Sequence, residues 1–144
     1  MSGLKTIFRT ALTATDSAAV DTLGDVRQEQ FKRYKYVKFT AAADAGDVVK
    51  YANSAGYIAN EALENTTSAL VVAGVAVATQ AINQFGWVQI GGIVVLAQSV
   101  NSGSIASGVM GHSTAGMFTI VTGVRSSYGT MLNTTTSCLL DCPD

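Results

Sequence analysis

The chain has 144 residues, which is enough for one domain with a core of its own but not for two comfortable ones. Charged residues make up 13% of it, about half the usual share, and hydrophobic residues make up 48%, which argues against intrinsic disorder. With 9 Lys and Arg against 10 Asp and Glu, no general attraction to nucleic acid or to an anionic membrane is expected.

The charged residues gather in the first half of the chain. Every Lys lies before residue 65, and the segment 65–124 contains no Lys, Arg, Asp or Glu. A monomer ordinarily carries charges along its strands as protection against edge-to-edge pairing. Their absence predicts that much of this segment is covered by the fold or by partner chains. The apolar runs 69–78 and 90–97 are too short to span a bilayer, so no membrane insertion is expected.

Residues 1–22 are predicted to form an N-terminal arm. They lack the apolar core of a secretory signal, so synthesis in the cytoplasm is expected. A stripe of apolar residues recurs there at helical spacing: Leu4, Ile7, Phe8, Ala11 and Leu12. This stripe is compatible with a membrane-surface helix or an organelle transit peptide. We favour an arm or short helix that docks on its own body or on a neighbour.

Residues 23–144 are predicted to form a single β domain. Aromatic and β-branched residues predict strands at 34–40, 48–51, 57–59, 70–79, 87–96, 118–122 and 137–140. Gly and Ser predict a loop over 99–116, and the likeliest helical or loop interruptions are 16–25 and 60–67. We therefore predict an all-β fold, a small β-barrel or β-sandwich (β-tulip or jelly-roll-like), with an N-terminal arm and few short helices.

Two segments resemble catalytic or phosphate-binding motifs, and both are incomplete. G111-H-S-T-A115 departs from the nucleophile elbow at its last position, and the chain's one histidine, His112, lies inside the motif, where it cannot serve the serine as base. G103-S-I-A-S-G108 has the glycine spacing of a phosphate loop, but Val109 and Met110 follow where Lys and Ser or Thr are needed. We expect neither an enzyme nor a bound cofactor.

Acidic residues and cysteines offer two other candidate sites. Asp44 and Asp47 fit a turn with side-chain-to-backbone hydrogen bonds more simply than an acid–base pair or a cation site. Cys138 and Cys142 lie beyond disulfide reach if the tail is extended, whereas a helical turn would permit a bridge, and we expect two thiols. One histidine and two cysteines are too few for the usual zinc site, so no metal is expected.

The segment F31-K-R-Y-K-Y-V-K-F39 interleaves basic and aromatic residues. Such a stretch can stack bases and contact phosphates, as single-strand binders do. It also fits a strand whose aromatic side chains pack inward while its lysines face solvent or protect an edge. A pI near 5.7 favours the strand, so we expect no direct nucleic-acid contact. Docking of an acidic protein partner stays open.

Three segments in order carry a resemblance to a known family. L23-G-D-V-R-Q-E-Q-F-K-R-Y-K-Y-V-K-F39 is followed by A45-G-D-V-V49, and then A73-G-V-A-V77 leads into F85-G-W-V-Q-I-G-G92. Over residues 23–97 the chain resembles the small head decoration (cement) proteins of tailed bacteriophages. Each piece is short, and the order and spacing carry the resemblance.

The resemblance implies a non-enzymatic virion protein on the exterior of the phage head, made in the host cytoplasm. Its expected partners are the major capsid protein, whose neighbouring subunits it would clamp, and further copies of itself in a homotrimer. An uncharged β-rich half agrees with burial in an oligomer.

An alternative is a carbohydrate- or ligand-binding β-module of a phage surface or fibre protein, with Trp87 and nearby tyrosines as a stacking platform. We also consider that Trp87 is simply a core residue. The double glycine at 91–92 predicts a bulge or bend in a central strand. The candidate interface or structural residues are Leu4, Phe8, Tyr34, Tyr36, Trp87, Gly91 and Gly92.

Overall fold

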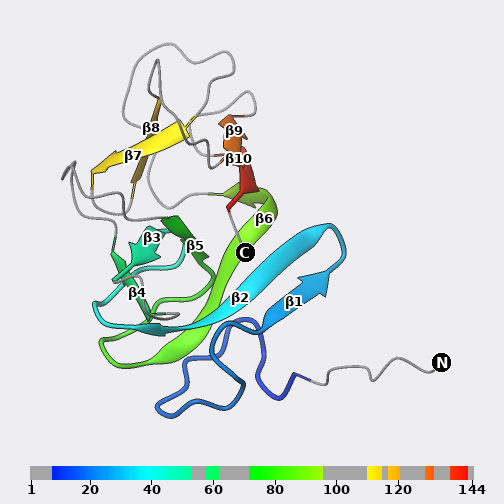
Figure 1. Cartoon of the computed structure of the whole chain (residues 1–144), viewed down its shortest axis with the longest axis vertical. Helices are drawn as coiled ribbons and strands as arrows, with labels where there is room; N and C mark the ends of the chain where they lie inside the picture. The colour runs from blue at the N-terminus through cyan, green and yellow to red at the C-terminus, as the bar shows by residue number, and fades with distance from the viewer. Residues whose placement is uncertain are drawn as a thin grey trace.

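The computed structural model describes residues 8–52, 58–61, 72–95, 110–114, 117–120, 129–131 and 137–142. Within these residues the chain forms strands and no helix (Figure 1). The first strands are β1 (Val26–Glu29), β2 (Lys32–Phe39), β3 (Val48–Tyr51), β4 (Ile58–Glu61), β5 (Val72–Ala76) and β6 (Phe85–Val95). They are followed by β7 (Met110–Thr114), β8 (Met117–Ile120), β9 (Gly129–Met131) and β10 (Ser137–Asp141).

Eight of these strands belong to one sheet. Its order is β1-β2-β4-β3-β5-β6-β10-β9, and β2 pairs with β6 as well. The pair β2–β4 is parallel and the other described pairs of the sheet are antiparallel. β7 and β8 form a separate antiparallel pair. The predicted all-β class is therefore confirmed for the part of the chain that the structure describes.

The predicted short helices are absent from the described segments. Residues 16–25 form turns, because their polar groups bond locally or to the sheet instead of to a helical backbone. The backbone N–H of Asp16 donates to the carbonyl of Phe85 at 2.9 Å, and Phe85 N–H donates back at 2.8 Å. The carboxylate of Asp25 accepts from the N–H of Thr22 at 3.3 Å. At the second predicted interruption, residues 60–61 belong to β4, and 62–67 lie outside the described residues.

β6 changes partners along its length. Its first part pairs with β2 and β5, and residues 91–95 pair with β10. The register against β2 shifts between Arg33, opposite Gly91, and Tyr34, opposite Gln89. Ile90 is thus the extra residue of a bulge, which bends the strand where its partner changes. The bulge or bend predicted beside the double glycine is confirmed.

Alternation along β2 separates two buried clusters. Val37 and Phe39 belong to a cluster of mostly aliphatic residues, whereas Tyr34 and Tyr36 belong to an aromatic cluster with Trp87. Successive side chains of a strand point to opposite faces, so one strand supplies both.

Several strand boundaries differ from prediction. β5 ends at Ala76, before the predicted end at 79, because residues 77–79 turn toward the short bridge between Gln80 and Ala43, and residues 70–71 lie outside the described residues. β1, β7 and β9 were not predicted, and β7 falls in the predicted loop 99–116. The sequences V-R-Q-E, M-G-H-S-T and G-T-M lack a clear alternation of apolar and polar residues, and pairing with a neighbouring strand makes them extended.

Candidate interaction surface

The aromatic cluster is built on one pair of facing residues. Tyr36 of β2 lies opposite Trp87 of β6, with ring centroids 5.1 Å apart. Phe8 packs edge-on against Trp87 at 5.4 Å and 83°. The guanidinium of Arg27 lies 5.5 Å from the Phe8 ring and 5.9 Å from the Trp87 ring. Trp87 and Tyr36 are fully buried, so neither offers a face for stacking a sugar or a base.

Polar contacts join residues 8–22 to this cluster. The hydroxyl of Tyr36 donates to the carboxylate of Asp16 at 2.9 Å, and the hydroxyl of Thr10 donates to the same oxygen at 2.9 Å. The backbone N–H of Val20 donates to the Tyr36 hydroxyl oxygen at 3.3 Å. Burial, with a smaller contribution from Asp16, raises the pKa of Tyr36 to about 12. Residues 8–22 therefore dock on the body of their own chain and contain no helix, so of the two expected forms the short helix is excluded for these residues.

The structure brings together four of the predicted site residues: Phe8, Tyr34, Tyr36 and Trp87. Leu4 lies outside the described residues. Tyr34 lies opposite Gln89, and its burial together with the nearby Glu29 raises the pKa of its hydroxyl. Together the described members form a packed face of the sheet, which is a structural role rather than an exposed contact.

The two glycines face the β1–β2 hairpin. Gly91 lies opposite Arg33, and Gly92 has a φ of 86°, a conformation that side-chain-bearing residues rarely adopt. A Cβ on Gly92 would lie 2.5 Å from the carbonyl oxygen of Phe31. Gly92 thus lets the tip of the hairpin approach the β6 backbone closely.

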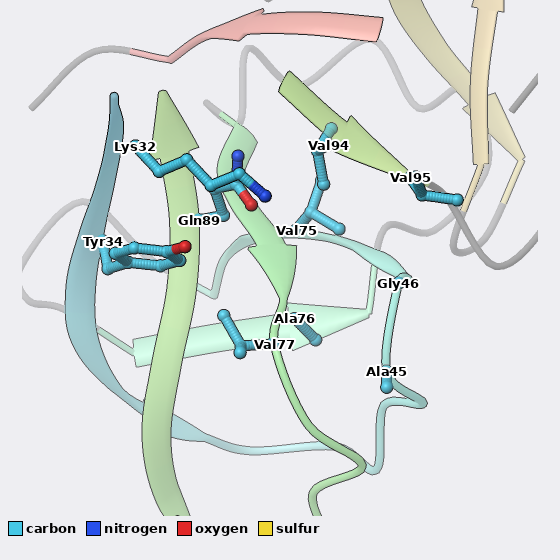
Figure 2. A pocket seen from close by; sticks show the side chains of 10 residues that line it. All are labelled: Lys32, Tyr34, Ala45, Gly46, Val75, Ala76, Val77, Gln89, Val94 and Val95. Carbon is cyan, nitrogen blue, oxygen red and sulfur yellow. The ribbon is translucent and has the colours of Figure 1, made fainter. Parts of the chain in front are cut away.

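A groove of about 450 Å³ lies between the hairpin, β5 and β6 (Figure 2). One side carries Lys32, Tyr34 and Gln89, and the rest is apolar: Ala45, Gly46, Val75, Ala76, Val77, Val94 and Val95. The amide of Gln89 donates to the carbonyls of Gly91 and Ile93, each at 3.0 Å, which holds that side of the groove in place.

Large apolar side chains are exposed near this groove. Phe31, at the hairpin tip, is 96% exposed, Val95 is 67% exposed and Ile93 is 53% exposed. Leu139 of β10, also exposed, lies directly opposite Ile93. Within the described part of the uncharged segment, the fold itself covers Val75, Trp87 and Ile90, whereas coverage of Ile93 and Val95 by a partner chain stays a prediction. The sequence did not mark Phe31 as a hairpin tip, because Gln30-Phe31 contains none of the Gly, Asn or Asp that are typical of a two-residue hairpin turn.

The basic segment 31–39 does not present a row of lysines to solvent. Lys35 is buried, with its Nζ donating to the Tyr51 hydroxyl at 2.9 Å. The Nζ of Lys38 lies 5.7 Å from the Phe85 ring. The expectation that the lysines of this strand face solvent is wrong for Lys35, because β2 has neighbours on both sides and both of its faces are covered over 34–37.

The other chemical motifs are accounted for as far as the structure describes them. The Asp47 carboxylate accepts from the Asp44 N–H at 2.8 Å, and the Asp47 N–H donates to the Asp44 carbonyl at 3.0 Å, which confirms the predicted turn. Residues 111–114 lie in the antiparallel strand β7, not on a strand-to-helix elbow. The segment 103–108 lies outside the described residues. Cys138 is in the extended strand β10, and Cys142, which follows it, is a buried thiol.

Neither a metal-binding cluster nor a membrane-spanning helix is found among the described residues. The described residues hold no group of three His, Cys, Asp or Glu side chains that could bind a metal ion. No helix with the length and hydropathy of a membrane span occurs among them.

Comparison with known proteins gives no relative. No family model matches the chain, and neither do the curated proteins or the solved structures that were searched. The assignment of function therefore depends on the sequence segments and on the geometry above.

Proposed function

We propose that this chain is a capsid decoration (cement) protein, which binds the exterior of a tailed-phage head as a homotrimer and clamps neighbouring major capsid subunits. The observation that carries the proposal is the exposure of large apolar side chains at the hairpin tip, at the end of β6 and on β10: Phe31, Ile93, Val95 and Leu139. Ile93 and Leu139 lie opposite each other on paired strands, and exposed apolar surface of this kind marks a binding face. The ordered segments over residues 23–97 that resemble this family support the same role.

The strength of such binding would come from many weak contacts. Burial of one aromatic side chain removes about 150–250 Å² from water, at about 25 cal/mol per Å². A trimer that presents the same face three times would gain avidity on a lattice without any single strong site. The role is non-enzymatic, and it uses no cofactor and no direct contact with nucleic acid or membrane.

We further propose that the sheet curves into a small barrel. The pairings link β2 to β4, β4 to β3, β3 to β5 and β5 to β6, and β6 pairs in turn with β2. A barrel would leave these strands without open edges, so the exposed side chains, and not free backbone groups, would select the partner.

The alternative role, a carbohydrate-binding module, is not favoured by the aromatic cluster. Trp87 and Tyr36 are fully buried, and Tyr34 is largely buried, so the expected stacking platform is not at the surface. A glycan array with the purified chain tests this alternative directly.

The proposed function is tested with undecorated heads assembled from the cognate major capsid protein. The purified chain should co-sediment with heads at a saturable ratio, add density to the outer surface in electron micrographs, and raise the temperature at which the heads disassemble. Heads that stay bare at low and moderate salt would contradict the proposal.

A further inference from the structure

We propose that the side chain of Phe31 from one copy of this chain inserts into the groove of a second copy. The occupant of the groove would thus be an aromatic residue at a hairpin tip, supplied by self-association. The inference deepens the proposed homotrimer, since it names the contact that would hold two subunits together.

Phe31 is presented as a fixed projection. The hairpin turn consists of Gln30, with a φ of 52°, and Phe31, and the pair Glu29 and Lys32 closes it. Beneath the turn, the Phe31 carbonyl lies where a Cβ on Gly92 would collide, so the tip is held close against β6. At 96% exposure, the phenyl ring contacts almost nothing in its own chain. An exposed aromatic side chain on a supported hairpin loses little conformational entropy when it is bound.

The groove is a receptor of matching chemistry. It has about 450 Å³ of space and is lined mainly by the small apolar side chains of β5 and β6 (Figure 2). Val75 lies in β5 and Val94 in β6, the N–H of Val77 donates to the Trp87 carbonyl at 3.1 Å, and Gln89 is held by its two hydrogen bonds. Such a hollow is large enough for one aromatic side chain and has the apolar surface that such a side chain prefers.

The groove lining is almost free of charge. Lys32 supplies its one charged side chain. In the hairpin that would enter, Glu29 next to the turn is ion-paired with Arg27 of its own strand. The contact is therefore argued from the apolar ring and the apolar lining, and not from an attraction between charges.

Phe31 and the groove are two different patches of the same chain. Each copy therefore both supplies a side chain, Phe31, and offers a groove. A contact between two different patches repeats from copy to copy and closes into a ring when the rotation permits. In a ring of three copies, each hairpin would occupy the groove of the next copy, as the proposed homotrimer requires.

Photo-crosslinking tests the contact. The full chain is made with p-benzoylphenylalanine in place of Phe31, mixed with ¹⁵N-labelled wild-type chain and irradiated. We expect crosslinks from position 31 to groove residues of the labelled chain, in the peptides that contain 72–77 or 89–95. Absence of crosslinks, or crosslinks to other peptides, overturns the inference.

Matched variants distinguish this contact from nonspecific hydrophobic association. Phe31→Ser should weaken self-association by about tenfold or more, measured by sedimentation, with unchanged circular dichroism. Val95→Asp, at the exposed rim of the groove, should weaken it as well. Ile82→Ser, which removes an apolar side chain that is 62% exposed and does not line the groove, should leave it unchanged. Equal effects of Phe31→Ser and Ile82→Ser would overturn the inference.

Head binding is read separately. If the wild-type chain binds heads but Phe31→Ser leaves the oligomer mass unchanged, the Phe31 contact is wrong and the decoration role stands. If crosslinks reach the groove but heads stay bare, the contact stands and the decoration role is wrong.

Discussion

The hydroxyl of Tyr36 in β2 donates a hydrogen bond of 2.9 Å to the carboxylate of Asp16, which lies 20 residues earlier in the chain. The same carboxylate oxygen accepts from the hydroxyl of Thr10, and the backbone of Asp16 pairs with that of Phe85. One aspartate thus connects the N-terminal segment to two strands of the sheet. Because Tyr36 is fully buried, this connection is part of the core and should respond to the ionisation of the phenol.

We predict that stability falls in alkaline solution through Tyr36. Its pKa is raised from 10.0 to about 12, so the unfolded chain loses this proton first. The associated stability is complete below pH 10 and is lost between pH 10 and pH 12, by up to about 3 kcal/mol. Urea denaturation at several pH values across this window measures the slope.

Tyr36→Phe is the control for this alkaline loss. It keeps the ring against Trp87 but has no ionisable hydroxyl, so its stability should fall less steeply over the same window. At neutral pH it should be less stable than the wild type by about 1–3 kcal/mol, since the hydroxyl that contacts Asp16 and Val20 is lost. Identical slopes for the two proteins would exclude Tyr36 as the titrating group.

Trp87→Ala should lower the free energy of unfolding by about 3–5 kcal/mol, because it leaves a cavity among Phe8, Tyr36 and the neighbouring core. Assembly should weaken in parallel. Trp87→Phe, which keeps an aromatic ring, should lower the free energy of unfolding by a smaller amount. Chemical denaturation followed by circular dichroism measures both variants. A Trp87→Ala protein with wild-type stability but altered binding would instead indicate that the indole contacts a partner.

Gly92→Ala should lower the stability of the folded chain clearly more than Gly91→Ala. At Gly92 the added Cβ meets a backbone oxygen at 2.5 Å and the residue has a φ of 86°, which alone costs on the order of 1–2 kcal/mol for an L-residue. At Gly91 the Cβ meets the Arg33 side chain at 2.9 Å, and that flexible group can move. Thermal unfolding of the two purified variants compares them. The opposite order of stability would show that the hairpin tip does not constrain Gly92.

The sequence was sufficient for the fold class and for the bent central strand. The aromatic and β-branched residues of 34–39 and 87–95 predict β2 and most of β6, and the double glycine at 91–92 predicts the bulge. It was insufficient for β1, whose residues V-R-Q-E are extended because β2 pairs with them. Strands of this kind depend on neighbours that are distant in space, not on their own composition.

The candidate surface was predicted only in part. Trp87 and the tyrosines were singled out by residue type, and the structure places them together, but as core. Phe31 could not be separated from the aromatic residues that follow it, since only the turn at Gln30 puts it outside the alternation of β2. The burial of Lys35 could not be predicted from the sequence either, because it depends on a contact with Tyr51 from another strand.

The last prediction concerns Asp47, whose pKa is raised, mainly by burial. Because the folded chain holds this proton more tightly than the unfolded chain, protonation of Asp47 stabilises the fold below the usual pKa of 3.8. This stabilisation is lost as the pH rises from 3.8 through the raised pKa of the folded chain. Asp47→Asn should therefore remove this pH dependence and be at least as stable as the wild type at neutral pH, because its amide oxygen can still accept from the Asp44 N–H. Asp47→Ala should be less stable by about 1 kcal/mol, since that N–H loses its acceptor. Denaturant titrations from pH 3 to pH 7 compare the three proteins, and a large loss in Asp47→Asn at neutral pH would show that the turn needs the charge itself.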